Sequence, residues 1–173
     1  MYLLFKSILS HDIPFLIRLY KIYVRSILDF GSSVYNSNAR QISYILEKVQ
    51  RRFTCLIFYR CLSFQYPQMP DYAERLKILN LESLESQRRK ADLLLFHKIL
   101  NGNVSLNATS QISSNRHISR TNPRGIVVMK SRLEARSNFF LSRVGRHFRA
   151  LPKSIQNMKS ESEFKYAISE NHL

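Results

Sequence analysis

The stretch ILEKVQRRFTCLI, residues 45–57, places three basic side chains inside an apolar pattern of helical spacing. The large apolar residues in and beside it recur at steps of three and four positions: Ile42, Ile45, Leu46, Val49, Phe53, Leu56 and Ile57. This period predicts a long amphipathic helix. On that helix Lys48 and Arg52 fall beside the apolar stripe, and Arg51 lies further round. These side chains either form the solvated edge of a packed helix or contact a negatively charged partner.

The preceding segment, residues 12–30, also predicts a helix. Asp12 is placed to cap its first turn, and Gly31 suits the position after its last turn. Apolar residues cover most of its faces, so we expect this helix to be central in the fold. No uncharged stretch of about 20 apolar residues occurs, so the sequence predicts no membrane span. We also expect no signal peptide, because Lys6 interrupts the apolar N-terminal run.

Two further helices are expected between residues 71 and 100. Asp71 is placed to cap a short helix at PDYAERLKILNL, and residues 82–100 form a longer one that ends at Asn101 and Gly102. The apolar stripe predicted for the longer helix consists of Leu84, Ala91, Leu94, Leu95 and Ile99.

The C-terminal part is separated by residues 102–122, which are rich in Ser, Asn and Thr and predict a linker. RGIVVMKSR is expected to be a strand or an extended arm. The next segment, from Glu134, is expected to be helical up to Pro152, and Ser162–Ser169 to form a short helix. The predicted fold is therefore mainly α, with a helical bundle over residues 1–101, the linker, and a smaller helical lobe over residues 123–173.

The charge of the chain is its most unusual feature. The sequence has 27 Lys and Arg against 12 Asp and Glu, which gives a net charge of +15. Self-repulsion of this size is usually offset by a polyanion, most often nucleic acid, with an anionic membrane surface as a less favoured alternative. The basic residues are spread over several helices, whereas a membrane-surface helix concentrates them on one element.

Three basic rows are the candidate nucleic-acid-binding residues. They are Lys48, Arg51 and Arg52; Arg88, Arg89 and Lys90; and Arg143, Arg146 and Arg149. Arginine offers a forked set of donors to phosphate oxygens, so such rows on helices could make contacts that do not depend on base sequence. For each row taken alone, a solvated helix face is the competing interpretation. Interleaved aromatic residues could stack on unpaired bases, although Phe53 and Phe148 fall on apolar stripes and are expected in the core.

The candidates for chemistry are few. Cys55 and Cys61 lack a second cysteine pair or a histidine at ligand spacing, which argues against zinc and for reduced thiols in an intracellular protein. Whether that location is nuclear or cytoplasmic is left open. The five histidines show no metal-binding spacing, and the glycines are scattered singly, so no phosphate-binding glycine loop is present.

Four stretches together resemble the region after the palm in non-LTR (LINE-type) retrotransposon reverse transcriptases. They are LYKIYVRSILDFGSSVYN, LEKVQRRFTCLI, YAERLKILNLESLESQRRKADLLLFHKILNG and RSNFFLSRVGRHFRALPKSIQNMKSESEFK. The resemblance runs from about Ile13 to Lys165 in the order of the family. Three positions depart from it: the family usually has proline at Ser26, tryptophan at Tyr35, and Trp-Asn at Phe148-Arg149.

The resemblance implies a thumb-like portion that grips the template–primer duplex behind the palm. Polymerases of this family hold two Mg²⁺ ions on an aromatic-x-Asp-Asp turn. This sequence has four aspartates, at 12, 29, 71 and 92, and no two are adjacent. We expect Asp12 and Asp71 to cap helices, Asp29 to lie in a last helical turn, and Asp92 to form a local ion pair.

The expected function is therefore that of a truncated C-terminal fragment of such an enzyme. It would bind RNA, DNA or a hybrid through the backbone, catalyse nothing by itself and need no cofactor, since Mg²⁺ belongs to the full-length parent. The alternative is an inert structural relic or a protein-interaction module, which packs on a separately encoded palm. In that case residues 13–30 would be partly an orphaned interface, and the pure chain would self-associate.

Overall fold

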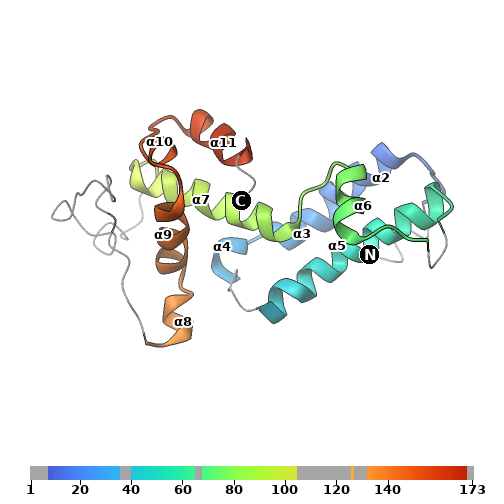
Figure 1. The fold of residues 1–173 in the computed structure, drawn as a ribbon, viewed down its shortest axis with the longest axis horizontal. Helices are drawn as coiled ribbons and strands as arrows, with labels where there is room; N and C mark the ends of the chain where they lie inside the picture. The colour runs from blue at the N-terminus through green and yellow to red at the C-terminus, as the bar shows by residue number, and fades with distance from the viewer. Residues whose placement is uncertain (1–7, 36–39, 65–67, 105–125, 127–131, 171–173) are drawn as a thin grey trace. The chain divides into compact units, whose positions relative to one another are not determined.

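The computed structural model describes residues 8–35, 40–64, 68–104, 126 and 132–170. Over these residues the chain is mainly α, as predicted (Figure 1). It divides into two compact units. Unit 1 comprises residues 1–32 and 39–85, and unit 2 comprises residues 33–38 and 86–173. Most of the predicted linker, and all of RGIVVMKSR except Ile126 and Arg132, lie outside the described residues.

Unit 1 is built around the long helix that the opening stretch predicts. Its elements are α2 (Ile13–Leu19), the π-helical η1 (Tyr20–Arg25), α3 (Ser26–Asp29), α5 (Arg40–Cys61) and α6 (Tyr72–Ile78). Both α2 and α6 pack against α5. The core contains the ring of Phe53, which stacks on that of Tyr20 with the ring centroids 4.0 Å apart. The prediction that Phe53 packs in the core is confirmed.

The start and end of the helical segment at residues 12–30 also agree with the prediction. Asp12 occupies the N-cap position of α2, and Pro14 lies in its first turn. Asp29 is the last residue of α3, and Gly31 adopts a positive φ of 66°, which glycine tolerates without strain. Asp71 likewise occupies the N-cap position of α6.

The expectation that this segment is central in the fold is wrong. Leu16 and Tyr20 are buried in the unit 1 core, but Ile27 is 73% exposed and Phe30 is 85% exposed. Phe15, Ile22 and Tyr23 are exposed as well. An apolar residue is buried only where a neighbouring element covers it. In this segment Leu16 and Tyr20 belong to the unit 1 core, and Ile13, Ile17 and Val24 pack against it.

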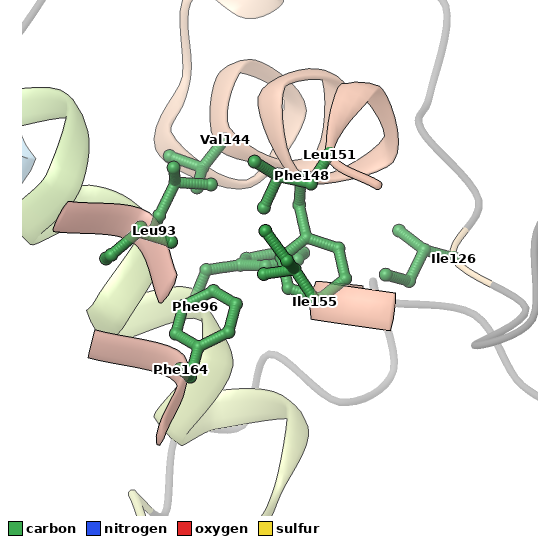
Figure 2. Packing of buried hydrophobic residues seen from close by; sticks show 9 residues of the cluster. Leu93, Phe96, Ile126, Val144, Phe148, Leu151, Ile155 and Phe164 are labelled. Carbon is green, nitrogen blue, oxygen red and sulfur yellow. The ribbon is translucent and has the colours of Figure 1, made fainter. Parts of the chain in front are cut away.

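Unit 2 is assembled on the long helix α7 (Leu84–Leu100), whose first two residues belong to unit 1. The other helices are α4 (Ser32–Tyr35), whose first residue also belongs to unit 1, α8 (Glu134–Ser137), α9 (Phe140–Ala150), α10 (Lys153–Gln156) and α11 (Glu161–Glu170). Figure 2 shows Leu93 and Phe96 of α7 meeting Val144 and Phe148 of α9, with Phe164 of α11 beside them. The short helix predicted at Ser162–Ser169 and the burial of Phe148 are both confirmed.

The structure therefore places the division of the chain earlier than the predicted boundary after residue 101. Residues 86–100 group with the C-terminal helices because Leu93, Phe96 and Ile99 are buried there. The apolar stripe predicted for this helix is also displaced, since Ala91 is exposed, while Leu94 and Leu95 are half-buried. The polar residues Arg88, Asp92 and His97 of α7 are also buried. A prediction from the spacing of apolar residues alone does not include them.

The helix predicted to run from Glu134 to Pro152 is broken between α8 and α9. Phe139 has a non-helical backbone conformation and occupies the N-cap position of α9. Two carbonyl groups beside the break accept hydrogen bonds from arginine side chains: that of Asn138 from Arg143 at 3.0 Å, and that of Ser137 from Arg146 at 2.7 Å. These guanidinium groups satisfy carbonyls whose helical partners are lost at the break.

Helix α11 offers a direct test of the unit 2 core. Phe164 is fully buried and Tyr166, two residues later, is exposed. We expect Phe164→Ala to lower the free energy of unfolding by about 3–5 kcal/mol, because it leaves a cavity, and Tyr166→Ala to change it by less than about 0.5 kcal/mol. Urea denaturation followed by circular dichroism measures both. Equal losses in the two variants would contradict this packing.

Candidate nucleic-acid interface

The inner face of α5 carries a polar network that fixes the orientation of the helix. Gln50 is buried, accepts a hydrogen bond from the Tyr20 hydroxyl at 2.9 Å, and donates one to the carbonyl oxygen of Glu82 at 2.7 Å. The Glu47 carboxylate, also buried, accepts hydrogen bonds from the Tyr72 hydroxyl and the backbone N–H of Leu84. Buried polar groups need such partners, so the network strongly favours one rotation of α5 about its axis.

The tyrosines of this network stay protonated at physiological pH. Burial raises the pKa of Tyr20 above its ordinary value, and burial together with the hydrogen bond to Glu47 raises the pKa of Tyr72. A neutral hydroxyl can donate to a carboxylate or an amide oxygen, which is the role that both tyrosines have here.

With its inner face fixed, α5 exposes the first basic row. Lys48, Arg51 and Arg52 are all exposed. The guanidinium of Arg51 lies over the ring of Tyr72, 4.4 Å from its centroid, so this side chain is held by a cation–π contact. Among the residues that the structure describes, none of the three forms an ion pair. The first row is therefore exposed basic surface on a single helix face.

The second row is divided between the interior and the surface of unit 2. Arg88 is only 2% exposed, so its side chain is not presented to a phosphate, and its prediction as a contact residue is wrong. Arg89 and Lys90 are half-buried, and the Lys90 ammonium donates to the carbonyl oxygen of Ser169 at 3.5 Å.

The third row loses its first member in the same way. Arg143 is 2% exposed, and its guanidinium forms an ion pair with Asp92 at 3.0 Å. It also donates to the carbonyl oxygens of Asn138 and Ser33. Arg143 is therefore a structural residue, which corrects its prediction as a phosphate contact. The partner that the structure shows for Asp92 lies 51 positions away along the chain, whereas the sequence suggested a local ion pair.

The exposed part of the third row consists of Arg146 and Arg149. The half-buried His147 reports on the electrostatics of this surface. Burial lowers its pKa below the ordinary value, and the neighbouring positive charges of Arg89, Arg146 and Arg143 lower it further. Residues of the second and third rows therefore act on one histidine, which the sequence analysis did not single out.

Other kinds of site find little support in the described part of the chain. No three His, Cys, Asp or Glu side chains gather there in a way that could hold a metal ion. Cys55 and Cys61 are free thiols.

A separate search of the same residues finds no helix long and apolar enough to cross a membrane.

The Asp92–Arg143 pair generates a prediction about the fold of unit 2. Asp92→Leu leaves a buried guanidinium without its carboxylate, so we expect a loss of about 3–5 kcal/mol in the free energy of unfolding. The double variant Asp92→Leu/Arg143→Met removes both charges and should recover most of that loss. A double-mutant cycle by urea denaturation measures the coupling. If the losses of the two single variants simply add in the double variant, the side chains of Asp92 and Arg143 do not stabilise unit 2 through their interaction.

Comparison with known proteins gives limited information. No protein-family profile matches the chain, and no solved structure does. An uncharacterized protein of Caenorhabditis elegans is 31% identical over 85 residues. The match covers 49% of this chain and 41% of the relative, so the chain spans about two fifths of the length of the curated protein that it matches. This similarity relates a part of each protein and carries no activity with it.

Proposed function

We propose that the chain binds nucleic acid through phosphate contacts that do not depend on base sequence. The observation that carries the proposal is the first basic row: Lys48, Arg51 and Arg52 are exposed together on α5 and form no ion pair with a described residue. Glu47 is the sole carboxylate in the sequence of α5, and it is buried and bonded to Tyr72. The field on this face is therefore positive, which favours a polyanion.

Unit 2 supplies the second part of the proposed surface. Arg89, Lys90, Arg146 and Arg149 remain candidates, whereas the buried Arg88 and Arg143 do not. The lowered pKa of His147 is consistent with a positive potential at this surface, since neighbouring cations disfavour a further charge.

The resemblance to the post-palm region of non-LTR reverse transcriptases points to the same activity, namely a grip on a template–primer duplex. The proposed role is binding without polymerase chemistry, since the sequence contains no adjacent pair of aspartates to hold the two metal ions.

The proposal is tested by the salt dependence of binding. Each phosphate contact to duplex contributes about 0.9 to the slope of log affinity against log salt. We expect Lys48→Glu/Arg52→Glu to make this slope shallower by about two and to weaken RNA–DNA hybrid and duplex DNA of unrelated sequence equally. Fluorescence anisotropy between about 50 and 200 mM salt measures it.

The matched control is Arg18→Glu/Lys21→Glu. These two residues are exposed in unit 1, and the substitutions change the net charge by the same amount. If both double variants lose the same affinity and slope, binding reflects total charge and the α5 row has no special role. Absence of wild-type binding at about 50 mM salt would leave the rows as solvated helix faces and reject the proposal.

A second candidate function, protein interaction, is favoured by the exposed apolar side chains of α2, η1 and α3 and of the residue that follows α3. Phe15, Ile22, Tyr23, Ile27 and the C-cap residue Phe30 are all exposed. Clusters of exposed apolar residues mark interaction sites or cause association.

If this face is an interface, the pure chain should self-associate, and Ile27→Glu should shift it toward monomer. Sizing chromatography with light scattering measures both, with Lys21→Glu as an exposed control on η1. A wild-type chain that stays monomeric at all concentrations would count against this second function.

A further inference from the structure

The outer face of α5 carries aromatic residues as well as the basic row. Tyr44 is 60% exposed and Tyr59 is 59% exposed. Helical geometry places both on the same side of α5 as Lys48 and Arg52, because steps of three and four residues connect the four positions. We call Tyr44, Lys48, Arg51, Arg52 and Tyr59 the α5 outer face.

Packing does not account for the two tyrosines. Other aromatic rings of α5 are buried, as Phe53 and Phe58 are, and contact aromatic partners. Within the described residues, neither Tyr44 nor Tyr59 has a ring contact or a hydrogen bond. The α5 outer face therefore offers two uncovered aromatic surfaces with cationic side chains between them.

We propose that the α5 outer face binds an unpaired strand of nucleic acid. Tyr44 and Tyr59 stack on bases, while Lys48 and Arg52 contact the phosphates between them. The proposal rests on the proposed function and makes it more specific. In a duplex the faces of the bases are covered by their neighbours, so two exposed tyrosines gain nothing from it. A single strand presents phosphates and base faces to the same surface.

The dimensions of the face agree with a short strand. Tyr44 and Tyr59 are 15 residues apart, which corresponds to roughly 22 Å along a helix. This length suffices for several nucleotides, and single-strand sites on known binding folds cover about 4–16 nucleotides. Arg51, held over Tyr72, supplies a fixed positive charge at the edge of the same face.

The absence of tryptophan from the chain allows a direct test. Tyr44→Trp and Tyr59→Trp each introduce a single tryptophan that can still stack on a base. A 12-nucleotide oligothymidylate should quench the fluorescence of both variants. Tyr23→Trp, in which the probe is exposed on η1 of the same unit, should not be quenched. The same titrations with a 12-base-pair duplex should leave all three probes unchanged.

The affinity measurement completes the test. We expect Tyr44→Leu/Tyr59→Leu to weaken binding of the oligothymidylate at least about tenfold, because stacking on two bases is lost, and to leave duplex binding unchanged. Tyr44→Trp/Tyr59→Trp should restore the affinity. Circular dichroism of each variant checks that the helix content is retained.

The possible failures are distinguishable. If both nucleic acids bind without quenching and without loss in the leucine variant, the stacking inference is overturned and the proposed phosphate binding stands. If neither the oligothymidylate nor the duplex binds at about 50 mM salt, the stacking inference and the proposed phosphate binding are both rejected. If the emission of the Tyr44→Trp and Tyr59→Trp variants changes with protein concentration in the absence of nucleic acid, a protein occupies this face, and the inference is overturned.

Discussion

The buried ion pair between Asp92 and Arg143 is the contact on which the basic surface of unit 2 depends. A guanidinium is stable in the interior only with a counter-charge and hydrogen-bond acceptors, and here the carboxylate of α7 and two backbone carbonyls provide them. Arg143 lies on the buried side of α9, whereas Arg146 and Arg149 lie further round the helix and are exposed. The ion pair therefore holds α9 in an orientation that leaves these two arginines accessible to a ligand.

In unit 1 a network of buried hydrogen bonds fixes the orientation of α5. Gln50 bonds to the Tyr20 hydroxyl and to the carbonyl oxygen of Glu82, which precedes α7. The Glu47 carboxylate accepts hydrogen bonds from the Tyr72 hydroxyl and from the backbone N–H of Leu84, the first residue of α7. Rotation of α5 would bury Lys48 or Arg52 and leave these partners unsatisfied. Polar burial thus acts on orientation more than on net stability, because each hydrogen bond to water lost is replaced by one within the protein.

The two proposed functions use different surfaces of unit 1. The nucleic-acid proposal needs the cationic and aromatic outer face of α5, whereas the interaction proposal needs the exposed apolar side chains of α2, η1 and α3. They are compatible in one molecule, as a basic binding surface with an apolar docking face. The contrast between them is physical: salt weakens the first by screening, but it does not weaken burial of apolar area.

The sequence by itself determined the mainly α fold, the positions of most helices and the burial of Phe53 and Phe148, because these depend on local period and on hydrophobicity. It also placed Asp12 and Asp71 at N-cap positions, although neither side chain forms a capping hydrogen bond. It also marked the basic rows. It did not show that Arg88 and Arg143 are buried, or that several large apolar residues of 13–30 are exposed. Nor did it show that the helix predicted from Glu134 to Pro152 breaks between α8 and α9. At that break the side chains of Arg143 and Arg146 donate hydrogen bonds to backbone carbonyls. Only the tertiary structure decided these points, because the partner that satisfies a buried charge, or covers an apolar face, lies far away along the chain.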